Sequence, residues 1–161
     1  MLKLVWDSSA LVNIKEPNAQ GYSPAHSLWK DLADGWISGP YQNIIPAIAS
    51  FELSAAVSRK RREDVNMLYE FWLIGENEII YPIDSNFLEK CSSLVQEEGF
   101  NTLRGADLIF ACIAKIEVGI LVTLDNHFDS VSDRIQVLNL NDSRENAEYS
   151  SDARLIGQGT Q

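Results

Sequence analysis

Four acidic residues stand beside apolar segments, where a carboxylate is costly to bury. Asp7 directly follows the apolar run "LKLVW", and Asp125 directly follows "ILVTL". Asp107 begins the stretch "DLIFACIAKI", which is apolar on almost every side of a helix, and Glu52 lies inside another helical pattern. Carboxylates in such positions act as structural caps, as metal ligands or as catalytic groups, so the four are considered together.

Each acid has an ordinary structural explanation when it is taken alone. Asp7 could cap a helix that begins near "SSAL", Asp107 could be favoured by a helix dipole, and Asp125 could be a turn residue in "DNH". Glu52 could point to solvent. Four acids brought to one rim would repel one another, because clustered anions lose hydration and raise each other's pKa unless a cation compensates.

A divalent metal ion is the simplest compensating cation. Of the four acids, only Asp107 has a Lys or Arg within three residues, namely Arg104. Carboxylate oxygens suit Mg²⁺ or Mn²⁺, and the chain has no Cys/His spacing of the zinc type. His127 is the only histidine near these acids, and we interpret it as a structural residue or as a support for a ligand. An acid-only metal site suits a substrate with anionic oxygens of its own, and phosphodiesters fit this description.

The elements that must position these acids alternate between strands and helices. Short apolar runs predict strands over 2–6, 43–48, 78–83, 120–124 and 135–140. Helical patterns predict helices over 23–38, 49–64, 65–74, 86–98 and 105–118. This alternation predicts an α/β fold whose parallel sheet is covered on both faces. Active sites of open parallel sheets form outside the carboxyl ends of the strands, which is where Asp7 and Asp125 would lie.

Length and composition indicate an ordinary globular domain. The 161 residues suit one domain, which we expect over 1–140, followed by a polar and loosely ordered tail over 141–161. No apolar run is long enough to span a bilayer, the first residues lack the features of a signal peptide, and Cys91 and Cys112 are expected to be reduced. We therefore expect a cytoplasmic protein with no membrane attachment.

The charge of the chain argues against a broad surface that coats nucleic acid. The formal net charge is −10, although bound cations and one local basic patch would still allow a nucleic-acid enzyme. The run "RKRR" is the candidate patch and consists of Arg59, Lys60, Arg61 and Arg62. It lies two to three helical turns after Glu52, roughly 10–15 Å away at the rise of an α-helix. It is either a solvated helix end or a contact for phosphates that flank the reacting one.

Four segments occur in an order that resembles the PIN domain. They are "VWDSSAL", "ASFELSAAV", "RGADLIFACIAK" and "ILVTLDNHFDSV". Within that family, the short single-domain layout is similar to the VapC-type toxins of type II toxin–antitoxin pairs. The resemblance extends from Leu2 to about Leu140 and implies a three-layer α/β/α sandwich with a central parallel five-stranded sheet in the order 3-2-1-4-5.

The resemblance also assigns roles by position. It implies an acidic quartet that is catalytic and binds metal: Asp7, Glu52, Asp107 and Asp125. Ser9 and Thr123 match hydroxyl positions that support the quartet. Asp129 is an additional acid that only some relatives carry, so it is a further possible ligand. The implied cofactor is Mg²⁺ or Mn²⁺.

The activity that the resemblance implies is metal-dependent endoribonuclease cleavage of RNA, with an antitoxin protein as partner and a homodimer as assembly. Trp29 and Trp36 fall on the apolar stripe of the 23–38 pattern, and Tyr69, Phe71 and Trp72 follow in the 65–74 pattern. These aromatic residues could form a groove for an antitoxin segment or could simply belong to the core. An RNA-processing PIN nuclease outside a toxin pair, and a PIN-fold binding module with weak catalysis, remain alternatives.

Other α/β site types fit the residues less well. A dehalogenase-type phosphatase requires a second Asp two residues after the first, whereas this chain has Ser9 in "DSSAL". A receiver domain requires paired acids in its first loop and a late Lys, and neither is in place. The chain contains neither GxGxxG nor GxxxxGK[ST], which disfavours a dinucleotide or ATP site.

Overall fold

A parallel five-stranded sheet forms the centre of the computed structural model, which describes residues 1–15, 23–61 and 75–141. Its strand order is β3-β2-β1-β4-β5, which confirms the order that the family resemblance implies. The strands are β1 (Leu2–Trp6), β2 (Tyr41–Pro46), β3 (Glu78–Tyr81), β4 (Ile120–Thr123) and β5 (Gln136–Asn139). All neighbouring pairs are parallel, so every strand ends at the same edge of the sheet.

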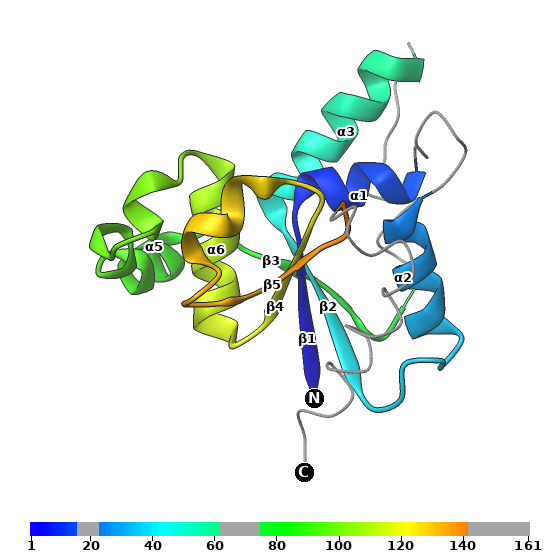
Figure 1. The fold of residues 1–161 in the computed structure, drawn as a ribbon. Coiled ribbons are helices and arrows are strands. Elements are labelled where there is room, and N and C mark those ends of the chain that lie inside the picture. The colour runs from blue at the N-terminus through cyan, green and yellow to red at the C-terminus, as the bar shows by residue number, and fades with distance from the viewer. Residues whose placement is uncertain (16–22, 62–74, 142–161) are drawn as a thin grey trace.

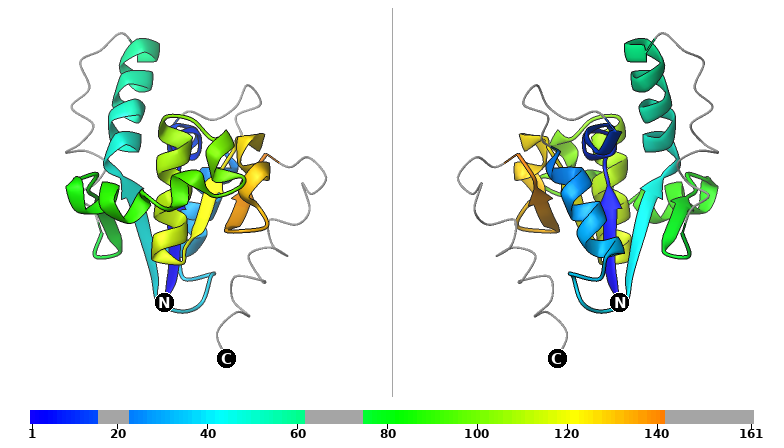
Figure 2. Two further views of the ribbon diagram at one scale, coloured as in Figure 1. Left: turned by 90° about the vertical axis from the view of Figure 1, so that its left-hand side faces the viewer. Right: turned by 90° about the vertical axis from the view of Figure 1, so that its right-hand side faces the viewer.

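Helices cover both faces of this sheet. The helices are α1 (Ser8–Lys15), α2 (Pro24–Ala33), α3 (Ala47–Arg61), α5 (Ser85–Cys91) and α6 (Ala106–Glu117), with short 3-10 turns η1 (Leu94–Gln96), η2 (Phe100–Thr102) and η3 (Asn126–Val131). Helices α1 and α2 lie on one face, and α5 and α6 lie on the other (Figures 1 and 2). Helix α3 continues from β2 beyond the edge of the sheet, beside α1 (Figure 1). This is the expected three-layer arrangement.

The core is centred on β1 and α6. Leu4, Val5 and Trp6 are fully buried because β1 is the middle strand and has helices on both faces. The Trp6 ring packs against Trp29 of α2 with their centroids 5.0 Å apart, and its indole N–H donates to Asn43 Oδ1 at 2.9 Å. An indole buried in this way needs such a partner for its donor. Helix α6 packs on β1 and β4, as its apolar composition predicts.

Helix α2 starts where the sequence predicts but ends earlier. The Ser23 hydroxyl accepts from the His26 amide as an N-cap, and Pro24 occupies the first helical position. The helix ends at Ala33 and not at residue 38, because the chain turns through Gly35 at φ 76°. Trp36 is therefore 80% exposed after the helix, and its expected place on the apolar stripe was wrong.

Two other helix ends differ from expectation. The 86–98 pattern forms a helix only as far as Cys91, after an N-cap by Asp84, and then continues as the separate turn η1. The sequence also indicated Gly119 as the residue that closes the 105–118 helix, but Val118 adopts the left-handed conformation that ends α6, at φ 52°. The predicted 65–74 helix, residues 62–64 and the tail beyond Asn141 lie outside the described residues.

Two expectations about the whole chain can be compared with the described residues. Cys91 and Cys112 are both free and buried, in agreement with their expected reduced state. Among the residues that the structure describes, no helix has the length and apolar character that a membrane span requires.

Gly99 allows a close approach between the η2 and η3 regions. Its φ is +86°, and a Cβ at this position would lie 2.2 Å from the Ser130 carbonyl oxygen. Gly35 has a similar φ of +76°, but a Cβ there would meet nothing within 4 Å. Gly99 is thus required for space as well as for backbone conformation.

Replacing Gly99 with Ala should therefore cost more than the same change at Gly35. The left-handed conformation alone costs an Ala about 1–2 kcal/mol, which is what we expect for Gly35→Ala. The clash with Ser130 should add roughly 1–3 kcal/mol for Gly99→Ala. Urea unfolding of both variants measures this difference. Equal losses of unfolding free energy would show that the packing around Gly99 is looser than described.

Candidate active site

The ends of two adjacent strands bring Asp7 and Asp125 to one edge of the sheet. Asp7 follows β1 directly, and its amide N–H donates to the Val122 carbonyl of β4 at 3.1 Å. Asp125 follows β4 by one residue and caps η3. Asp107 lies in the first turn of α6, whose N-terminus is at the same edge (Figure 1). Three of the four predicted acids thus come from neighbouring strand and helix ends.

Asp7 is a buried carboxylate held by several donors. Its side chain is in a residue that is only 3% exposed. One carboxylate oxygen accepts from Ser9 Oγ at 2.7 Å and from the Ala10 amide at 2.8 Å, and the other accepts from Thr123 Oγ1. Burial raises the pKa of the Asp7 carboxyl above its ordinary value, and Asp125 adds to this effect, while the hydrogen bonds oppose it. The Ala10 contact is also that of a helix N-cap, so the structural explanation of Asp7 and a functional one are compatible.

Two hydroxyl groups join the ends of β1 and β4. Thr123 Oγ1 donates to Asp7 and accepts from the Asp125 amide at 2.8 Å. Ser9 Oγ donates to Asp7 and accepts from the Leu124 amide at 3.0 Å. Each hydroxyl therefore donates to the carboxylate after β1 and accepts from a backbone amide after β4. Ser9 and Thr123 fix the position of Asp7 relative to the segment that carries Asp125.

A histidine lies between the other two acids of this edge. His127 Nδ1 is 3.5 Å from Asp107 Oδ2 and 3.4 Å from Asp125 Oδ1, and the His127 amide donates to Asp125 Oδ1 at 3.0 Å. Burial raises the pKa of the Asp107 carboxyl, and Asp125 raises it further, while His127 opposes both. From the sequence alone, His127 was expected to have only a supporting or structural role. Its place two residues after Asp125 was the available signal, but nothing in the sequence related it to Asp107.

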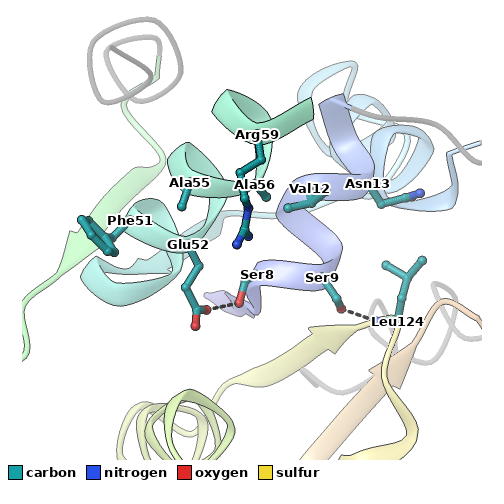
Figure 3. Close-up of a pocket in the computed structure, with 10 residues that line it drawn as sticks. All are labelled: Ser8, Ser9, Val12, Asn13, Phe51, Glu52, Ala55, Ala56, Arg59 and Leu124. Carbon is teal, nitrogen blue, oxygen red and sulfur yellow. Dashed lines mark hydrogen bonds between the residues drawn. The ribbon is translucent and has the colours of Figure 1, made fainter. Parts of the chain in front are cut away.

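Glu52 lies on α3 and is connected to the other acids through α1. Its carboxylate accepts from the hydroxyl of Ser8, the residue after Asp7. Glu52 and Ser8 also border a cavity of about 740 Å³ (Figure 3). The full lining is Ser8, Ser9, Val12, Asn13, Phe51, Glu52, Ala55, Ala56, Arg59 and Leu124. The role of Ser8 was not predicted, because a hydroxyl beside an acid in a sequence is too common to be informative.

Of the basic run, only the Arg59 side chain belongs to the described residues, and Asp129 is described as well. The Arg59 side chain extends from α3 towards Ser8 and Glu52, so it reaches closer to the acids than its two helical turns of separation suggest (Figure 3). The side chains of Lys60 and Arg61, and the whole of Arg62, lie outside the described residues. Asp129 is exposed on η3, and the ion pairs found between described residues do not include it.

The donor atoms at this edge suit a hard divalent cation in kind. They are carboxylate oxygens, and the pKa values of Asp7 and Asp107 are raised by burial and by the neighbouring charge of Asp125, which a bound cation would relieve. In the part of the chain that the structure describes, no three His, Cys, Asp or Glu side chains lie close enough together to hold an ion as they stand. A metal site here is therefore supported by donor chemistry and not by a formed coordination shell.

Comparison with known families identifies the domain. The family model described as "PIN domain" matches residues 5–134, which include all four acids and the strand ends that carry them. The chain belongs to the PIN domain family. A search of curated proteins gave no match.

Two solved structures share the PIN fold of this chain. One is VapBC2 from Rickettsia felis bound to a DNA fragment from their promoter, with a TM-score of 0.56 and 18% identity over 86% of this chain and 98% of that chain. The other is FitAcB from Neisseria gonorrhoeae, with a TM-score of 0.52 and 15% identity over 86% of this chain and 99% of that chain. At these identities the comparison establishes the fold of the PIN domain.

Thr123 offers a direct test of how Asp7 is held. Thr123→Val keeps the shape of the side chain. It removes the donor to one oxygen of the buried Asp7 carboxylate and the acceptor of the Asp125 amide. We expect it to lower the free energy of unfolding by about 2 kcal/mol, as for hydrogen bonds to charged groups. Thr123→Ser keeps the hydroxyl and should lose clearly less. Urea unfolding at pH 7 compares the two. A Val variant as stable as the Ser variant would contradict the proposed role of this hydroxyl.

The raised pKa of Asp107 predicts how its charge affects stability in the absence of metal. Because the folded-state pKa lies above the ordinary value of 3.8, the contribution of Asp107 is most favourable below that value and is lost as pH rises through the folded-state pKa. At pH 7 the charged group is a net cost, which Asp107→Asn removes. In EDTA, the variant should melt roughly 1–3 °C above the unmodified protein at pH 7.

The increase should diminish as the pH falls towards 4, where the carboxyl group takes up a proton in both states. Thermal melts across this pH range measure it, with Glu76→Gln, an exposed acid in a turn, as the control. If Asp107→Asn instead unfolds the protein at pH 7, Asp107 is a structural residue of α6.

Proposed function

We propose that this PIN-domain protein is a metal-dependent endoribonuclease that hydrolyses phosphodiester bonds of RNA, and that it is the toxin of a toxin–antitoxin pair. The observation that carries the proposal is the gathering of Asp7, Asp107 and Asp125 at one edge of the sheet, where the hydroxyls of Thr123 and Ser9 fix the buried member. Three carboxylates at one edge repel one another, which costs free energy of folding. A structural role as a helix cap would require only one of them, so structural needs alone do not explain the cluster.

The cofactor in this proposal is Mg²⁺ or Mn²⁺. Asp7, Asp107 and Asp125 would hold it, with Glu52 completing the quartet and Asp129 as a possible addition. When bound, the metal supplies polarisation of the phosphoryl oxygen, activation of water and stabilisation of the leaving oxygen. Carboxylate oxygens are the appropriate donors for these cations.

The residues of the chain would perform the remaining tasks. Thr123 and Ser9 hold the Asp7 carboxylate in one orientation, since each also bonds the segment after β4. Ser8 donates to the Glu52 carboxylate and so restricts its orientation beside α1. Arg59 extends towards this side, where a guanidinium can neutralise phosphates of the RNA.

The toxin assignment is supported by the layout of the chain. The two solved structures named above are covered almost completely by this chain, and one is a VapBC complex, whose VapC component is the class that the sequence resembles. The antitoxin, the homodimer and the cytoplasmic location are part of the same proposal. The structure does not support an antitoxin groove on the apolar stripe of α2, because Trp36 lies outside α2 and Trp29 packs on Trp6.

RNA cleavage separates this proposal from a binding module. The unmodified protein should cut RNA in Mg²⁺ or Mn²⁺ and stop in EDTA. Asp7→Asn removes one negative oxygen with little change in shape and should reduce the rate by a factor of roughly a hundred or more, as for loss of one transition-state charge contact. Asp34→Asn, an exposed acid at the end of α2, is the matched control.

Full activity of Asp7→Asn would exclude this site as the nuclease centre. If the unmodified protein cuts no RNA with either metal, the binding-module alternative gains support.

Arg59 tests the contact with phosphates. Arg59→Ala should weaken RNA binding and reduce the salt slope by just under one unit, because about 0.7 counterions are released per phosphate contact on a single strand. The maximal cleavage rate should change much less. Fluorescence anisotropy at several salt concentrations measures both affinity and slope, with Lys30→Ala on the exposed face of α2 as control. An unchanged affinity and slope would make the residue a solvated helix end.

A further inference from the structure

A cavity between α1 and α3 lies directly beside the acids but is larger than they require. Its walls are Ser8, Ser9, Val12 and Asn13 from α1 and five residues of α3, with Leu124 at the base (Figure 3). Only Glu52 and the two serines belong to the acid site. Of the remaining lining, only Arg59 has a part in the proposed function, as a contact for phosphates.

The size of this cavity matches a small organic ligand. It is an open groove and not an enclosed pocket, and its volume of about 740 Å³ leaves room for such a molecule to lie in it. The space exists because α3 presents Ala55 and Ala56 on the side where Val12 of α1 faces it (Figure 3). All three side chains are only partly buried, so the walls are apolar but accessible.

Arg59 and Phe51, at the cavity, have side chains of the kinds that suit a nucleotide. Arg59 extends over the cavity, and it takes part in none of the ion pairs found between described residues. Phe51, at the outer edge of the cavity, is 74% exposed. An exposed ring is a surface on which a nucleobase can stack, and a guanidinium suits a phosphate.

We propose that this cavity binds the nucleotide next to the phosphodiester that is cut, and that it sets a base preference at that position. The base lies over Ala55 and Ala56 with Phe51 at its edge, and Arg59 pairs with the phosphate. The proposal rests on the proposed ribonuclease function. A nucleotide fits better than a peptide segment because the cavity adjoins the acids and combines small apolar walls with Arg59, which forms no ion pair with another described residue.

Cleavage of a random-sequence RNA pool tests this inference. Sequencing of the cut ends gives the base frequencies on each side of the scissile bond. The unmodified protein should favour one or two bases at one adjacent position by at least threefold. Ala56→Leu, which fills the cavity, and Phe51→Ala, which removes the ring, should each bring that preference close to random while RNA is still cut.

Two matched controls separate the cavity from general effects. Ala33→Leu makes the same change at an exposed position of α2, and Leu88→Ala removes an exposed apolar side chain from α5. Both should keep the base preference of the unmodified protein. Circular dichroism melts establish that all four variants fold.

Each outcome decides the matter. An unmodified protein that cuts RNA with no base preference, or cavity variants that keep the same preference, would overturn the inference and leave the nuclease assignment in place. The second result would assign the cavity to another occupant, such as a segment of a protein partner. If the unmodified protein cuts nothing in the pool, the proposed function itself fails, and the cavity inference fails with it.

Discussion

The site is organised by the burial of one carboxylate. Asp7 sits at the end of the central strand with almost no exposure, where desolvation raises its pKa and disfavours its charge. Three donors counter this cost, and two of them are hydroxyls of Ser9 and Thr123 that also bind the chain after β4. The hydrogen bonds that the Asp7 carboxylate requires thereby fix the end of β1 relative to the end of β4. This determines where Asp125 lies.

The parallel sheet converts this local constraint into a site. Because all strands end at one edge, the acids after β1 and β4 and the acid that opens α6 come together without any loop designed for the purpose. His127 reduces the repulsion between Asp107 and Asp125, whereas no cationic side chain among the described residues forms an ion pair with Asp7. The charge that remains is the physical reason for proposing a divalent cation, and the neighbouring cavity with Arg59 is the reason for proposing that the substrate is anionic.

The fold and the candidate acids could be predicted from the sequence, but the contacts between distant segments could not. Apolar runs predicted all five strands, and the family resemblance supplied their order. The end of α2 was misjudged because helical spacing continued to Trp36 after the backbone had turned at Gly35. The contact of His127 with Asp107 could not be predicted, because it depends on tertiary packing, which neither spacing nor residue type reveals. The roles assigned to the acids, to Ser9 and to Thr123 remain predictions.

The central claim is that the acids at this edge bind a divalent metal ion, and anomalous scattering from crystals grown with Mn²⁺ tests it most directly. The account predicts one strong peak at the carboxyl edge of β1 and β4, bonded to oxygens of Asp7 and of at least one of Asp107 and Asp125. No peak at this edge at saturating Mn²⁺, with the same side chains still bonded only to Thr123, Ser9, the Ala10 amide and His127, would contradict it.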